Sequence, residues 1–175
     1  MSVADRSIIE ALDALLKGTS VRATIDPIVR QVEQKLAQDR TAVMAWEPIP
    51  LSAYGGALPG MIRSSWVFIL RAGATTGAER HPNSHQRMMS YRGKGDLQTW
   101  AEDGWHSNLL VSEKNTDLEE RWVSVLPNAW HQAVVPGQDW VVVSFHTVAA
   151  HELIEERPDA TDSHLSHQRM YLAEP

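Results

Sequence analysis

The chain has 175 residues, a formal net charge of −6 at pH 7 and no cysteine. Without cysteine, disulfides, thiolate nucleophiles and thiolate metal sites are excluded. The acidic balance, with no cluster of lysine or arginine, argues against nucleic-acid binding, which needs many basic contacts to phosphates. The chain is long enough for one domain with a real core. It shows neither a targeting signal nor an apolar run of membrane-spanning length, so we expect a cytoplasmic protein with no membrane partner.

Two amphipathic helices are predicted at the start of the chain. Residues 3–17 place isoleucine and leucine at helical spacing, and the glycine that follows is a suitable C-terminal cap. The second helix is predicted to begin with Asp26 as N-cap and Pro27 at the first helical position, and to end near Arg40. Each helix has one apolar face to bury. We therefore expect an N-terminal helical extension over residues 1–45.

The remainder of the chain has the pattern of β-structure. Short runs rich in valine, tryptophan and phenylalanine alternate with turns that contain glycine, proline, asparagine or aspartate. These runs predict strands over Ser65–Ala72, Arg87–Arg92, Asp96–Trp100, Arg121–Leu126, Trp130–Val135 and Asp139–Val148, with a final strand near Arg169–Leu172. Short strands at this spacing are typical of a sandwich or barrel. We expect an all-β domain over residues 46–175.

One polar segment, GATTGAERHPNSHQRMMSYRG over residues 73–93, contains candidate metal ligands. Glu79 and His81 are two residues apart, so on a strand their side chains would point to the same face. A further imidazole, His131, comes from a distant segment at the start of another strand. We expect the histidines outside this segment, apart from His131, to lie at the surface or in hydrogen bonds: His106, His146, His151, His164 and His167.

The spacing in this segment resembles the first motif of the cupin superfamily. That motif is a glycine, five residues, His-x-His, three or four residues, Glu, six residues and a glycine. Here Gly73 is followed by five residues, Glu79-Arg80-His81, four residues, Gln86, six residues and Gly93. The spacing matches at every step.

The second cupin motif, a proline, a small residue, one or two more and a histidine, looks like the run from Pro127 to His131. This half departs from the family at Arg121, Ala129 and Val135, where glycine, glycine and asparagine are usual. The resemblance covers roughly residues 64–148. It implies a single antiparallel jelly-roll barrel, preceded by the two helices and carrying the ligands inside it.

Carried over position by position, the resemblance implies metal ligands at Glu79, His81, Gln86 and His131. Glu79 replaces the first histidine and Gln86 the usual glutamate, so the set keeps two imidazoles and one carboxylate. His85 is an alternative to Gln86, because imidazole binds borderline metals better than an amide does, whereas the spacing favours Gln86. Two histidines and a carboxylate favour Fe(II), although Mn, Ni, Co or Zn would accept the same donors.

The function expected from this site is that of a metal-dependent cupin enzyme, with a non-haem Fe(II) dioxygenase acting on a small organic acid or aromatic compound favoured. Arg71 is a candidate for binding a substrate carboxylate. Alternatively, the ion acts as a Lewis acid in a lyase or isomerase, with Tyr91, His85 or Glu79 as the base. A third interpretation is a non-catalytic module that binds or senses a small molecule. The resemblance also implies a homodimer.

Overall fold

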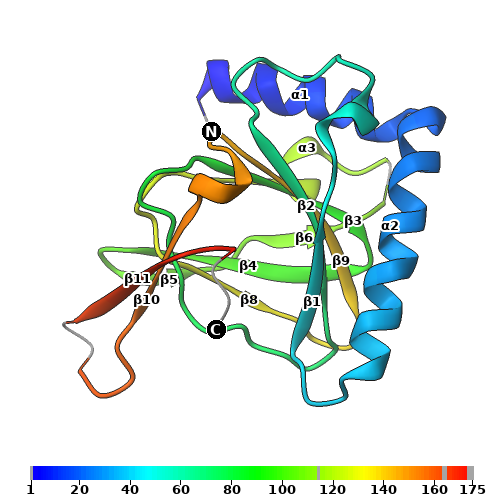
Figure 1. Cartoon of the computed structure of the whole chain (residues 1–175). Coiled ribbons are helices and arrows are strands. Elements are labelled where there is room, and N and C mark those ends of the chain that lie inside the picture. Colours follow the sequence, from blue (N-terminus) through cyan, green and yellow to red (C-terminus); the bar gives the residue numbers. More distant parts are fainter. Residues whose placement is uncertain (1, 114, 163–164, 173–175) are drawn as a thin grey trace.

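The computed structural model describes residues 2–113, 115–162 and 165–172, and Figure 1 shows the chain as helices packed beside antiparallel strands. Helix α1 covers Val3–Lys17 and helix α2 covers Thr19–Gln38. A single turn of helix, α3 (Leu118–Arg121), and two short 3-10 segments, η1 (Leu51–Tyr54) and η2 (Ala150–Glu152), lie between strands. No helix in these described ranges is long and apolar enough to cross a membrane.

The strands form two larger antiparallel sheets and one hairpin. The first sheet has the order β1-β2-β9-β3-β7, and in the second β4 pairs with β5, β6 and β8. Strands β10 and β11 pair only with each other among the described strands and form a C-terminal hairpin. The strand bounds are β1 Met44–Pro48, β2 Ser64–Leu70, β3 Gln86–Arg92, β4 Lys94–Ala101, β5 Gly104–His106, β6 Leu109–Val111, β7 Trp122–Val125, β8 His131–Val134, β9 Trp140–His146, β10 Ile154–Pro158 and β11 Ser166–Met170.

The first sheet is buried on both faces. One face carries alternate residues of its central strands, such as Val67 and Val143, and packs against α1 and α2. The other carries the intervening residues, such as Leu70 and Val142, and packs against the second sheet inside the barrel. Because strand side chains alternate between faces, a central strand covered on both sides is apolar at successive positions. In Figure 1 the helices lie on one side of the barrel and the β10–β11 hairpin on the opposite side.

The all-β barrel preceded by two helices is confirmed, and each of the six main predicted strands is present with bounds that differ by one or two residues. The second helix was predicted to begin too late. Its buried stripe starts at Val21 and Ile25, six and two residues before Pro27, which lies inside α2. Burial of this stripe against the sheet outweighs the roughly 3 kcal/mol that an interior proline costs a helix. Asp26 caps nothing and instead accepts a hydrogen bond from a tyrosine on β3.

Strands β1, β5 and β6 were not predicted, and for the segment of β10 a helical turn and a short strand were both open. Strands β5 and β6 have only three residues each, too few to display a period. Strand β1 begins at Met44, just before the predicted end of the helical extension. Gly18 caps the C-terminus of α1, as expected, and with φ −65° it joins the end of α1 directly to the start of α2.

Candidate metal centre

The centre is built on three neighbouring antiparallel segments: strand β8, residues 75–81, and strand β10. Glu79 and His131 face each other as a backbone pair, each donating its N–H to the other's carbonyl at 2.8 Å. Arg80 and Glu156 form the same kind of pair at 3.0 Å on the other edge of the segment. This pairing fixes which residues lie side by side. The side chains of Glu79 and His131 are thereby held on one face of the barrel wall.

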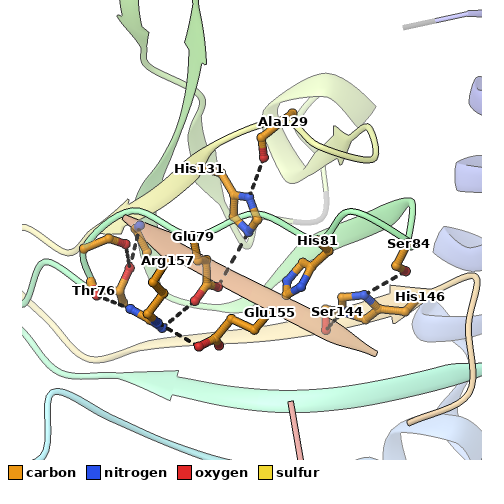
Figure 2. A network of polar contacts seen from close by, with 12 residues as sticks. Thr76, Glu79, His81, Ser84, Ala129, His131, Ser144, His146, Glu155 and Arg157 are labelled. Carbon is orange, nitrogen blue, oxygen red and sulfur yellow. Dashed lines mark hydrogen bonds and ion pairs between the residues drawn. The ribbon is translucent and has the colours of Figure 1, made fainter. Parts of the chain in front are cut away.

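Glu79, His81 and His131 each offer a ligand atom, and these three atoms lie within 4.8 Å of one another. His81 and His131 are buried, with 4% and 2% of their surface exposed. The Oε1 atom of Glu79 is 3.6 Å from Nε2 of His131. Figure 2 shows Glu79 and His81, from one segment, converging with His131 from β8. Within the described ranges this is the group of histidine and acidic residues that could hold an ion.

Backbone carbonyls set the tautomers of both imidazoles. Nδ1 of His81 is 2.9 Å from the carbonyl oxygen of Ile154, and Nδ1 of His131 is 3.1 Å from that of Ala129. A carbonyl only accepts, so each Nδ1 carries the proton and donates it. In both neutral rings Nε2 is then left with a free lone pair. This is the arrangement by which proteins orient histidine ligands toward a metal.

The charges at the site suit a cation. Burial acts to raise the pKa of Glu79, but His131, His81 and Arg157 outweigh burial and lower that pKa from 4.5 to about 2 while the imidazoles are protonated; when the imidazoles are neutral, the charge of Arg157 still favours the ionised carboxylate. Burial also lowers the pKa of His81, which favours its neutral form. An ionised carboxylate and neutral imidazoles are the protonation states that metal binding requires.

Two buried polar atoms at the site lack hydrogen-bond partners among the described residues: Nε2 of His131 and Oε1 of Gln86. An unpartnered buried polar atom is unfavourable by about 1–3 kcal/mol, so such atoms are rare in folded proteins. A bound cation would give both atoms a partner, because each has a lone pair with which it can bind a metal. The residues present therefore fit a transition-metal ion.

Gln86, the first residue of β3, faces the barrel interior and lines a small cavity together with Glu79 and His131. The cavity has a volume of about 40 Å³. Apart from Thr76 and these three residues its lining is apolar: Met44, Phe68, Leu70, Met88, Leu97, Ala133, Trp140 and Val142.

His85 lies on the other side of the first sheet. Its Nε2 is 2.7 Å from Oγ of Ser124, and its Nδ1 is 3.1 Å from the guanidinium of Arg87, which is paired with Asp5 on α1. The structure therefore does not bring His85 to the cluster. The reason is strand alternation, because adjacent residues point to opposite faces and Gln86 takes the inner one.

The two residues predicted to act on substrate also lie elsewhere. Tyr91 faces the helices and donates a hydrogen bond from its hydroxyl to Asp26 at 2.7 Å. Arg71 follows the end of β2 and donates to three backbone carbonyls at and after the end of α2, those of Leu36, Asp39 and Ala42. Those carbonyls have no partner within the helix, so Arg71 serves as its C-terminal cap. Neither side chain lines the cavity.

Sequence reasoning missed three residues beside the centre. His146 is hydrogen-bonded as expected, to Ser84 and Ser144, but its burial beside the centre, with its ring centre 5.2 Å from that of His81, was not predicted. Arg157 pairs with Glu79, and Tyr171 lies over His81 with ring centres 6.1 Å apart. His146 ends a strand whose period places it inward, a signal that could have been used. His164 lies outside the described residues.

No family model and no curated protein matches the sequence. Among solved structures, an oxalate oxidase in complex with the substrate analogue glycolate has a TM-score of 0.48 and 11% identity, over 63% of this chain and 54% of its own. CapF, a capsular polysaccharide assembling protein from Staphylococcus aureus, has a TM-score of 0.47 and 13% identity over 71% of this chain and 31% of its own.

An oxalate decarboxylase from Lactobacillus farciminis, as its formate complex, has a TM-score of 0.46 and 10% identity over 61% of this chain and 29% of its own. The chain thus spans about half the length of the oxalate oxidase and less than a third of the other two proteins. The antiparallel barrel of two sheets is the arrangement that the resemblance to cupins predicts, and Glu79, His81 and His131, at the positions of both sequence motifs, form a cluster that could hold a metal ion.

Proposed function

We propose that the chain is a metal-dependent cupin enzyme, a non-haem Fe(II) dioxygenase that acts on a small organic acid. The observation that supports this proposal is the set of two imidazoles and one carboxylate that converge on a common point, with both imidazoles buried and oriented by backbone carbonyls. Two histidines and one carboxylate with positions left open are typical of non-haem Fe(II) oxygenases. When bound, the ion would supply the open positions at which an acid substrate and O₂ meet.

The residues around the ion have separable roles in this proposal. Glu79 supplies the negative charge, and the two imidazoles supply neutral donors. Gln86 presents its unpartnered amide oxygen to the cavity, as a fourth ligand or as an acceptor for a substrate hydroxyl. The apolar wall, which includes Met88 and Trp140, excludes water from the reacting groups.

The size of the cavity supports an organic acid over an aromatic substrate. The cavity is small, with a volume of about 40 Å³. A substrate of a few heavy atoms fits this space beside Glu79 and His131. An aromatic ring would require the wall to open.

The Lewis-acid alternative loses its candidate bases in this arrangement. Tyr91 and His85 lie outside the cavity. Glu79 is paired with Arg157, and its pKa of about 2 makes it a poor proton acceptor near neutral pH. The third interpretation, a binding or sensing module, predicts that a ligand binds with or without an ion.

Metal analysis and oxygen uptake test the proposal. Protein purified without chelator should contain close to one transition-metal ion per chain, and Glu79→Ala should lose it. Turnover of short organic acids should require both Fe(II) and O₂. Turnover that continues without O₂ would favour a lyase or isomerase, and ligand binding by metal-free Glu79→Ala would favour the binding module. The homodimer expected from the resemblance stays a prediction, to be tested by sedimentation.

A further inference from the structure

The C-terminal hairpin places an arginine directly against the candidate metal-binding carboxylate. Arg157, on β10, donates from Nη2 to Oε2 of Glu79 at 2.6 Å and from Nε to Oε1 of Glu155 at 2.8 Å. Its third nitrogen, Nη1, is 3.3 Å from the carbonyl oxygen of Thr76. Figure 2 shows this fork of contacts beside the histidine cluster. All three guanidinium nitrogens are thus used at the edge of the site.

These contacts divide the two oxygens of Glu79 between different partners. Oε2 is taken by Arg157, whereas Oε1 points to the cluster, 3.6 Å from Nε2 of His131. A carboxylate bound through both oxygens occupies two positions on a metal, and one bound through a single oxygen occupies one. Whether Glu79 binds through one oxygen or two therefore decides how many coordination positions on the ion stay open.

We infer that Arg157 is a positioning residue that holds Glu79 as a one-oxygen ligand and so keeps a coordination position open for substrate. This inference rests on the proposed metal site. A glutamate has more rotatable bonds than a histidine and two donor atoms, so it needs an outer partner to fix its geometry. Arg157 supplies that partner from a part of the chain 78 residues away in sequence.

Arg157 is itself held in place by the hairpin. Glu155, with 1% of its surface exposed, binds Arg157 through Oε1 and binds Arg169 of the paired strand through the same atom. Glu155 and Arg169 face each other in the register of β10 and β11. The guanidinium is therefore fixed before any ion binds, which is what a positioning role requires.

Arg169 offers a matched control. Both arginines pair with Glu155, but only Arg157 contacts Glu79. Arg157→Gln and Arg169→Gln therefore each remove an ion pair of the hairpin, and only the first releases the ligand carboxylate. The comparison separates positioning of Glu79 from simple weakening of the hairpin.

The test is a titration of metal-free full-length protein with Co(II), followed by visible absorption, which reports the coordination number of the bound ion. Arg157→Gln should weaken Co(II) binding by about 10- to 100-fold, the usual effect of losing an outer partner of a ligand, and change the shape of the spectrum. Arg169→Gln should leave affinity within about twofold and the spectrum unchanged. Equal effects of the two variants, or no effect of Arg157→Gln, would overturn the inference.

Arg157→Lys keeps the charge and can donate to Glu79 but cannot form the fork, so it should restore part of the affinity lost in Arg157→Gln. If Arg157→Gln does not fold, Arg157→Lys against Arg169→Lys decides: weaker binding only in the first supports the inference, and equal binding overturns it. If the unmodified protein binds no Co(II), the metal site itself is refuted. If it binds Co(II) and the Arg157 variants match it, only the positioning role is refuted.

Discussion

Replacing His131 with phenylalanine should affect the metal-free and metal-bound protein in opposite directions. In the metal-free protein the change removes the hydrogen bond to the carbonyl of Ala129, worth about 1 kcal/mol, and also removes the unpartnered Nε2, which is unfavourable by about 1–3 kcal/mol. The free energy of unfolding should therefore range from unchanged to about 2 kcal/mol higher. Phenylalanine keeps the ring, so no large cavity opens.

With metal present, the unmodified protein should be more stable than His131→Phe. An ion at 100 times its dissociation constant stabilises a protein that binds it only when folded by about 2.7 kcal/mol. For a chain of this size, 1 kcal/mol corresponds to roughly 2–4 °C in melting temperature. The unmodified protein should therefore melt about 5–11 °C higher with metal than without it. The variant, which lacks a ligand, should show almost none of this rise.

Thermal melts of both proteins, with chelator and with Co(II) or Fe(II), measure the effect. His85→Phe serves as the control, because His85 is an imidazole near the motif that binds Ser124 and lies outside the cluster. It should keep the full metal-dependent rise. A rise that survives in His131→Phe but disappears in His85→Phe would refute the assignment of ligands.

Three further predictions concern two ion pairs and one close packing contact that stabilise the fold. Asp13→Ala leaves a buried arginine without its carboxylate and should lower stability by about 3–5 kcal/mol, or roughly 6–20 °C in a thermal melt. Gly95→Ala places a Cβ 2.2 Å from the indole of Trp140 in the cavity wall, and should lower stability in urea by about 1–3 kcal/mol. Hydrogen bonding from Arg80 lowers the pKa of Glu156 from 4.5 to about 2, so the carboxylate stabilises the fold fully above pH 4.5 and loses that effect toward pH 2. The stability difference in urea between unmodified protein and Glu156→Gln should narrow over that range.

Each of these predictions has a control or a contrary outcome. Glu10→Ala removes an exposed carboxylate of the same helix as Asp13 and should change stability by less than about 0.5 kcal/mol. Gly137→Ala, where an added Cβ meets nothing within 4 Å, should be neutral, so equal losses at Gly95 and Gly137 would contradict the packing argument. A Glu156→Gln difference that stays constant from pH 6 to pH 2 would contradict the ion-pair argument.

Local patterns predicted the elements wherever one physical effect dominates. Strands β2 and β9 each contain a run of consecutive apolar residues, Trp66–Leu70 and Trp140–Val143, because both faces are covered, and this pattern needs no knowledge of the partner. The start of α2 was misplaced because two effects compete there. Asp26 and Pro27 carry a local start signal, whereas burial of Val21 against the sheet decides the outcome. Local signals alone cannot weigh a tertiary contact.

The same distinction applies to the ligands. Glu79 and His81 were predicted as neighbours because two residues along a strand share a face, and the structure brings them together. The choice between His85 and Gln86 depended on the residue at which β3 turns inward. That residue is fixed by pairing of Gln86 with Val125 and His146 on the flanking strands, which the motif does not reveal.

The C-terminal hairpin is where prediction from the sequence stops for a physical reason. The run EERP at residues 155–158 is charged, and charged residues are rarely buried unless paired. Glu155 is nevertheless buried because Arg157 and Arg169 both bind it. Arg157 also meets Glu79, whose position depends on a different strand pair, so the partners of the hairpin carboxylate are not evident from the local sequence. Glu79 of the metal site and the buried Glu155 of the hairpin thus share the guanidinium of Arg157, so loss of Arg157 should affect both carboxylates, whereas loss of Arg169 should affect Glu155 alone.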